Sequence, residues 1–445
     1  MISNYIKLAI RVLGRNKFFT TISLFGISFT LAILMILISM LETEAGKTPP
    51  LSNKDKMVII PNINLKRIHY DTIYAYDTTI YNGSTVIDTS YTLQDAGSSN
   101  SNSEFGLWFL EEHLSAVPNA KEYSFFNRSR VYNSYVNNSK VELKALYSDH
   151  RFWDVFDFQF VDGFGFSQST VENEELVAVI TDDLADKYFG RRDNIVGELI
   201  EMDSREFKII GVVKPAGVLL LAVDIIVPYT HDHLELQNRD EYGFGAYTAM
   251  YLGDKTSDVE LIKEDIAFIN SKTEVPAPAQ DDYDIIEFKP YGFLEAYAGL
   301  LLDLDEPKKS LSIMKWVLIA LFGFLIILPT LNLINLNVGR IMERSSEIGV
   351  RKSFGASQRN ILIQFIIENT IQTFLGGIIG LGLAVLGIYL INDARLMGDV
   401  VLKINYRFFS YSIIICLTFG LLSGLLPAYK MSKLHVVSAL KQNKL

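Results

Sequence analysis

Four long stretches of the chain carry no Asp, Glu, Lys or Arg and consist mostly of apolar residues. They are 18–41, 316–339, 369–392 and 408–429, and each is 22 or 24 residues long. A helix needs roughly 20 apolar residues to cross a bilayer. A buried helix of a soluble protein rarely runs so far without a charge. The pattern therefore predicts four transmembrane helices.

The first stretch, 18–41, has an alternative interpretation as a cleaved signal peptide. Its apolar run exceeds the roughly 7–15 residues of a typical signal-peptide core. The sequence Thr43-Glu44-Ala45 that follows it is a poor match to a cleavage site. These features favour an uncleaved anchor helix.

Short basic segments predict the orientation of the four helices. Segments 1–17 and 430–445 each carry four Lys or Arg and no acid, and five basic residues lie in 340–359. Basic segments stay in the cytoplasm, so both termini are expected there, and 42–312 and 393–407 lie outside. The outer segment has a net charge of −22 and the rest of the chain +12. The overall charge of −10 excludes a general affinity for nucleic acid.

The outer segment, 42–312, has a mixed pattern of helix and strand. Its lack of cysteine excludes a disulfide, since the chain has only Cys416. Local patterns predict strands at 57–61, 176–180, 199–202 and 207–213, and hairpin turns at 137–138 and 203–205. Ser103, Thr181 and Ser257 are each predicted to cap a helix.

The region 71–103 is rich in Thr, Tyr, Ser, Asn and Gly. It is compatible with strands that expose their tyrosines or with a partly disordered excursion. The simpler interpretation is a surface insert, and the alternative is a loop that contacts a substrate or a partner.

A search for catalytic chemistry finds little. The chain contains no G-x-x-x-x-G-K-[ST], G-x-S-x-G or H-E-x-x-H sequence. His231 and His233, with Asp232 and Glu235, resemble a loose metal site, but we expect a polar surface segment without metal there. We therefore predict that the chain is not an enzyme and binds no cofactor directly.

Small residues recur four apart on three of the apolar runs, where they permit close helix approach in lipid. The close packing can occur between helices of one chain or between two copies of the chain in a homodimer. Pro329 is expected to kink the second span. Glu368 lies near the cytoplasmic entrance of the third span, and the charge-free span cores argue against an ion pathway. The small pairs are Gly26 and Thr30, Gly376 and Gly380, and Gly420 and Gly424.

The loop between the second and third spans reads as a short amphipathic helix over 342–356. Glu347 and Arg351 lie four residues apart and can pair, and Gly355 ends the helix. The simple interpretation is a connector on the membrane surface; the alternative is a docking helix for a cytoplasmic partner. The candidate docking residues are Glu343, Glu347, Ile348, Gly349, Val350, Arg351, Lys352, Phe354, Gly355 and Ala356.

This loop and the chain's end resemble the FtsX-like permease family of ABC transporters, and specifically its MacB-type branch. Glu347-Ile-Gly-Val-Arg-Lys-Ser-Phe-Gly-Ala356 is similar to the family's loop signature, and Ser423-Gly-Leu-Leu-Pro-Ala-Tyr429 to its ending. The stretch 179–190 resembles the middle of the MacB periplasmic domain. Ser353, Val436 and Ser438 depart from the pattern, and 71–103 has no recognised counterpart.

The resemblance implies a membrane α-helical protein with a large mixed α/β domain inserted between its first two helices. It places the chain in a bacterial inner membrane with the large domain in the periplasm. The expected membrane parts are 1–41 with the first helix and 313–339, 361–392 and 408–429 with the other three. The periplasmic domain is expected at 42–312, with an inserted subdomain at about 145–215. The remaining parts are the coupling loop at 340–360, an external loop at 393–407 and the cytoplasmic tail at 430–445.

The resemblance also implies a mechanism. Two copies of the chain would join two copies of a separate ATPase, which would bind ATP and Mg²⁺ in place of this chain. ATP-driven motion would pass through the first two spans to the outer domain, for efflux or envelope export, with a periplasmic adaptor and an outer-membrane channel as further expected partners. The alternative is a non-transporting regulator that controls envelope enzymes through the same motion.

Overall fold

The computed structural model describes residues 17–81, 84–127, 130–136, 139–216, 221–237, 242–302, 306–343 and 357–394, with 350, 353–355, 396, 402, 410–411, 414 and 418. The chain forms two compact units. The helical unit comprises Met1–Gly46 and Ile313–Leu445, and the outer unit comprises Lys47–Ser312.

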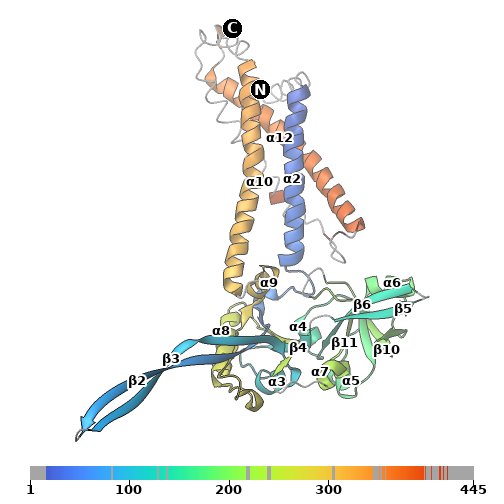
Figure 1. The fold of residues 1–445 in the computed structure, drawn as a ribbon. Helices are drawn as coiled ribbons and strands as arrows, with labels where there is room; N and C mark the ends of the chain where they lie inside the picture. Colours follow the sequence, from blue (N-terminus) through green and yellow to red (C-terminus); the bar gives the residue numbers. More distant parts are fainter. Residues whose placement is uncertain are drawn as a thin grey trace. The chain divides into compact units, whose positions relative to one another are not determined.

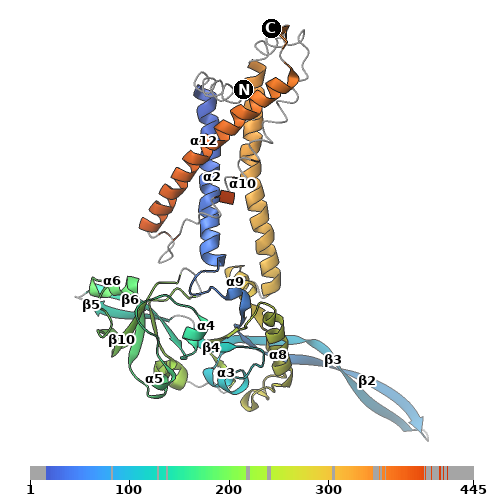
Figure 2. The ribbon, with the colours of Figure 1, turned by 180° about the vertical axis from the view of Figure 1, so that it is seen from behind.

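The helical unit contains α2 (Lys17–Ala45), α12 (Gln358–Asp393) and most of α10 (Pro307–Glu343). Residues 20–42 and 359–393 are long and apolar enough to cross a membrane. The second predicted span lies within α10, and the fourth falls almost wholly outside the described residues. Figures 1 and 2 show α12 crossing α2 obliquely.

The outer unit is a mixed α/β body, as the sequence predicts. Its described strands are β1 (Met57–Ile60), β2 (Ile63–Tyr81), β3 (Ser84–Phe105), β4 (Glu122–Asn127), β5 (Arg130–Val136), β6 (Ser139–Ser148), β7 (Phe160–Gly163), β8 (Val177–Thr181), β9 (Leu199–Met202), β10 (Arg205–Val213), β11 (Ile225–Pro228), β12 (Phe244–Gly245), β13 (Tyr247–Leu252), β14 (Ile285–Phe288) and β15 (Tyr291–Gly292).

The outer unit also contains helices before, between and after these strands. They are η1 (Lys54–Lys56), α3 (Leu107–His113), α4 (Phe152–Val155), α5 (Gln168–Glu172), α6 (Asp182–Phe189), η3 (Tyr229–His231), α7 (His233–Gln237), α8 (Asp258–Lys272), η4 (Ala277–Ala279) and α9 (Phe293–Leu302).

The strands pair in the order β14-β2-β3-β13-β4-β6-β11-β8-β10-β7, and β1, β5, β9, β12 and β15 add to the sides of this path. β8 is parallel to β10 and is buried along its whole length, as expected of a strand covered on both faces. Residues that alternate along these strands belong to two large apolar clusters, which form the core of the outer unit.

Several local predictions for the outer unit are confirmed. Thr181 caps α6 by accepting a hydrogen bond from the Leu184 N–H, and Gly190 ends the helix with a φ of +67°. Asp203 and Ser204 connect β9 to β10 with φ values of +53° and +60°, which is the geometry of a tight hairpin turn.

One predicted cap is wrong, and a second is right in position only. Ser103 lies inside β3, where it pairs with Ile63 of β2, and α3 begins only after Gly106. The backbone hydrogen bonds of the sheet therefore override the capping preference of Ser103. Ser257 precedes α8 but makes no capping hydrogen bond; Lys255 N instead donates to Asp258 Oδ2 at 2.8 Å.

The region 71–103 forms strands. β2 and β3 pair continuously from Ile63–Ser103 to Tyr81–Ser84. In both views the hairpin projects well beyond the rest of the outer unit (Figures 1 and 2). Tyr70, Tyr74 and Tyr91 are exposed on it, as the strand interpretation predicts.

Candidate functional site

The predicted docking segment is described only in part. Val350 is exposed, and the phenyl ring of Phe354 is 87% exposed. A turn holds this piece together, since Phe354 N donates to Val350 O at 3.2 Å and Gly355 has a φ of +89°. Ser357 then caps α12 by accepting from Asn360 N. An exposed large apolar ring is a contact available to a partner.

The other candidates in this segment lie mostly outside the described residues. Glu343 ends α10. The candidates that fall outside the described residues are Glu347, Ile348, Gly349, Arg351, Lys352 and Ala356.

Gly376 and Gly380 of α12 face α2 of the same chain. A Cβ atom on Gly376 would lie 2.7 Å from Ile27 Cγ2, and one on Gly380 would lie 2.8 Å from Ser28 O. These distances are shorter than any normal carbon contact, so glycine is needed for the two helices to approach this closely. Gly420 and Gly424 lie outside the described residues.

On α2, Thr30 Oγ1 donates to Gly26 O at 2.9 Å, so this pair is joined within its own helix. Pro329 lies inside α10, which continues on both sides of it from Pro307 to Glu343.

A row of polar side chains is buried along α12, and Glu368 is the one among them that the sequence singles out. Gln364, Glu368 and Gln372 are spaced four apart, and Gln364 Nε2 donates to Glu368 Oε1 at 3.0 Å. The part of α12 that is long and apolar enough to cross a membrane, 359–393, includes Glu368.

In the outer unit, three neighbouring strands have one apolar and one polar face. Ile63 and Leu65 of β2 and Phe288 of β14 are buried in the core. The residues between them point to the opposite face. In the strand register, Glu287 of β14 lies opposite Asn64 of β2, and Asn64 lies opposite Asn102 of β3. This alternation is what a sheet covered on one side requires.

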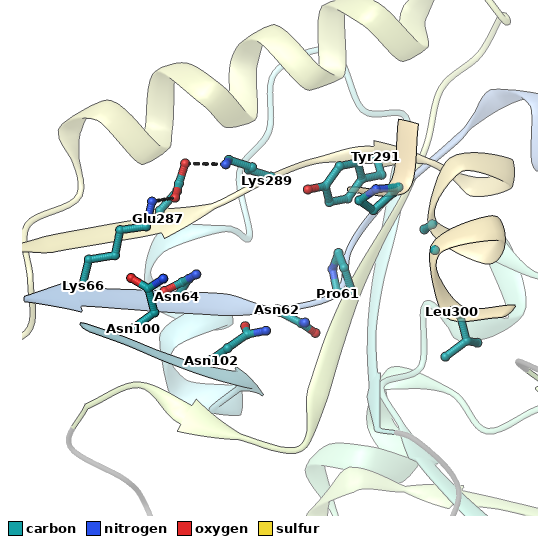
Figure 3. Close-up of a pocket in the computed structure, with 13 residues that line it drawn as sticks. Pro61, Asn62, Asn64, Lys66, Asn100, Asn102, Glu287, Lys289, Tyr291 and Leu300 are labelled. Carbon is teal, nitrogen blue, oxygen red and sulfur yellow. Dashed lines mark ion pairs between the residues drawn. The ribbon is translucent and has the colours of Figure 1, made fainter. Parts of the chain in front are cut away.

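The polar face forms the floor of a recess with a cavity volume of about 610 Å³. We call it the polar recess. Four asparagines lie along the floor, and α9 with Leu300 lies at one side (Figure 3). Pro307, at the start of α10, also lines the recess. It is lined by Pro61, Asn62, Asn64, Lys66, Asn100, Asn102, Glu287, Lys289, Tyr291, Ala296, Gly299, Leu300 and Pro307.

At one end of the polar recess, a single carboxylate forms ion pairs with two lysines. Glu287 pairs with Lys66 and, at 2.7 Å, with Lys289. Burial opposes ionisation of Glu287, but the hydrogen bonds from Lys289 and Lys66 outweigh it and hold its pKa below the usual value. The hydrogen bond to Glu287 likewise raises the pKa of Lys289. With two lysines and one carboxylate, the lining of the polar recess has a formal charge of +1.

The histidine segment at 231–235 is more deeply buried than predicted. His231 and Asp232 are buried, which contradicts the expectation of a polar surface. His231 Nε2 lies 2.9 Å from Glu175 O, and His233 Nε2 lies 2.6 Å from Arg205 Nη1. No group of three potential metal ligands gathers among the residues that the structure describes.

Asp232 instead joins three elements of the outer unit. It accepts hydrogen bonds from Asn127 Nδ2 at 3.1 Å, from Tyr247 Oη at 3.2 Å and from Arg130 Nη1 at 2.5 Å. We call these four residues the Asp232 cluster. Burial, aided by the carboxylate, raises the pKa of Tyr247, so its hydroxyl stays protonated as a donor. Asp232 itself is buried while the Arg130 side chain is 25% exposed, so the carboxylate ties the three strands together beneath a partly exposed guanidinium.

Asp149 is a second buried carboxyl group. Ser124 Oγ donates to Asp149 Oδ1 at 2.6 Å, and Arg151 Nη1 lies 3.6 Å from Oδ2. Burial raises the pKa of Asp149 to about 6, and the partners offset only part of this effect.

We expect the Asp149→Asn substitution to remove a pH dependence from the stability of the outer unit. The folded pKa of Asp149 lies above the unfolded value of 3.8. The free energy of unfolding that comes from the neutral carboxyl group is therefore fully present below pH 3.8 and is lost as the pH rises through about 6. Relative to the variant, the wild type should lose about 3 kcal/mol between about pH 4 and 7. Thermal unfolding across this range checks it, and parallel pH curves for the two proteins would contradict it.

Two family comparisons together cover most of the chain. Residues 20–267 match the MacB-like periplasmic core domain. Residues 319–436 match the FtsX-like permease C-terminal domain.

Individual relatives are more distant. The chain is 26% identical over 297 residues to the pyoverdine export ATP-binding/permease protein PvdT of Pseudomonas syringae, covering 66% of this chain and 42% of that protein. It is 23% identical over 352 residues to the ABC transporter permease YknZ of Bacillus subtilis, covering 74% and 83%. The chain thus spans about two fifths of the length of PvdT and most of YknZ.

A solved structure of a domain of a permease protein from Porphyromonas gingivalis is also similar. The identity is 14%, and the match covers 55% of this chain and 92% of that one, with a TM-score of 0.36.

Proposed function

Because the chain belongs to the family of FtsX-like permeases with a MacB-like periplasmic core domain, we propose that it acts with a separate ATPase as the permease subunit of an ABC transporter. The observation that carries the proposal is the agreement between the two matches and the two units. The MacB-like match covers α2 and most of the outer unit, and the FtsX-like match falls within the helical unit.

In this proposal the chain transmits force and does not hydrolyse ATP. Two copies of the chain join two copies of the ATPase, which binds ATP and Mg²⁺. The segment 342–356 docks on the ATPase, and Phe354 supplies its apolar contact. The connection from α10 to α9, and from α2 to β1, then carries the motion into the outer unit.

The proposed class of transported substrate is inferred from the names of similar proteins. PvdT is named for pyoverdine export, and we propose efflux or envelope export for this chain. The proposed location is a bacterial inner membrane, with four spans, both termini in the cytoplasm and the outer unit in the periplasm. A periplasmic adaptor and an outer-membrane channel complete the proposed pathway.

The docking role of 342–356 is tested by Phe354→Asp and Glu347→Lys. A charge on the exposed ring position removes the apolar contact, and reversal at 347 breaks its expected pairing with Arg351. We expect each variant to reduce the ATPase recovered per permease chain about tenfold, with normal membrane insertion.

The matched control is Leu396→Asp, since Leu396 is 73% exposed but lies in the loop predicted to be external. It should recover as much ATPase as the wild type. Wild-type recovery with both docking variants would show that 342–356 is only a connector.

A further inference from the structure

The polar recess has charged side chains at one end and an aromatic ring at the other. Figure 3 shows the Lys66–Glu287–Lys289 ion pairs at one end and Tyr291 with Pro61 at the other. The amides of Asn64, Asn100, Asn62 and Asn102 lie between them. A ligand in the recess would therefore meet charge first, then amides, then an aromatic ring.

The charged end favours an anion. Two lysines share a single carboxylate, and Lys289 remains largely exposed with donors to spare. This positive charge stands out because the segment 42–312 has a net charge of −22. A ligand with a carboxylate or phosphate would gain charge-assisted hydrogen bonds here that a neutral ligand would not.

The floor favours a body rich in hydroxyl groups. Each asparagine offers two donors and an acceptor, and a sugar hydroxyl both donates and accepts. Asn64 Oδ1 is buried without a hydrogen-bond partner among the described residues, so the floor is not satisfied by its own contacts.

The aromatic end of the polar recess and the volume of the recess also fit a sugar. The ring of Tyr291 and the side chain of Pro61 offer an apolar surface to the C–H face of a sugar. The volume of about 610 Å³ falls in the range of small-molecule sites. We propose that the polar recess binds an acidic saccharide, with its acid on Lys66 and Lys289 and its hydroxyls on the asparagines. The proposal is independent of docking to an ATPase.

The test is a calorimetric titration of the full-length chain in a detergent that has no sugar headgroup. Glucuronic acid is the probe, glucose tests the need for the acid, and acetate tests the need for the hydroxyls. We expect saturable binding of glucuronic acid and about tenfold weaker binding of glucose and of acetate.

Three variants test the location. Lys66→Met removes one ammonium group, and Asn102→Leu removes an exposed amide whose loss does not disturb the core. Each should weaken glucuronic acid binding about tenfold while the unfolding temperature of Asn102→Leu stays unchanged. Lys140→Met, at an exposed ion pair with Glu142 on the same unit, should bind as the wild type does.

Three results would overturn the proposal. They are the absence of saturable glucuronic acid binding, equal binding of glucose or acetate, and wild-type affinity in the Lys66 and Asn102 variants.

Discussion

Replacing Gly380 by leucine is expected to separate α12 from α2 and to destabilise the helical unit by about 3 kcal/mol. Even the first carbon of the side chain would lie 2.8 Å from Ser28 O and 3.0 Å from Leu31 Cβ. The first of these atoms belongs to the backbone, which cannot rotate away, so the helices must move apart.

The same helix provides the control. A Cβ atom on Gly382 would have no heavy atom within 4 Å, so Gly382→Leu should be tolerated. Both variants remove one glycine from α12 and add the same side chain. Fluorescence-detected size exclusion after heating in detergent measures the two unfolding temperatures. Equal losses in both variants would mean that the crossing of α2 and α12 does not depend on Gly380.

The second large effect is expected at Asp232, in the outer unit. Asp232→Ala should destabilise that unit by about 3–5 kcal/mol, because the substitution leaves Arg130 without its buried counter-ion. Asn127 and Tyr247 lose an acceptor in the same place. Asp232 is 1% exposed, so water cannot replace the lost carboxylate.

Thermal unfolding of the full-length chain, followed by tryptophan fluorescence, measures this loss. Glu142→Ala is the control, because Glu142 pairs with Lys140 at the surface, and its unfolding temperature should match the wild type. If Asp232→Ala unfolds at the wild-type temperature, the Asp232 cluster does not stabilise the outer unit.

Local sequence patterns predict those parts of the fold that depend on local forces. The turn at Asp203 and Ser204 and the cap at Thr181 each involve residues within a few positions of one another. Ser103 and Ser257 carry the same type of pattern, but there the outcome depends on distant strands or on a neighbouring carboxylate. A capping preference of about 1 kcal/mol is too small to overcome a ladder of backbone hydrogen bonds.

The polar recess and the Asp232 cluster could not be predicted, because their residues are far apart in the chain. Asn64, Asn102 and Glu287 meet only through the register of β2, β3 and β14. A partial indication was present in the alternation of Asn62, Asn64 and Lys66 with apolar residues, which marks a strand with one polar face. Asp232 carried no such pattern, and its burial follows from tertiary packing alone.

The proposed force-transmitting permease is tested most directly by purifying the tagged full-length chain from its native membranes in mild detergent and quantifying its partners by mass spectrometry. We predict an ABC-type ATPase in equimolar amount, with ATP hydrolysis in the purified complex, and an about tenfold lower recovery of this ATPase with the Phe354→Asp variant. Repeated recovery of folded chain with no ABC-type ATPase would contradict the account.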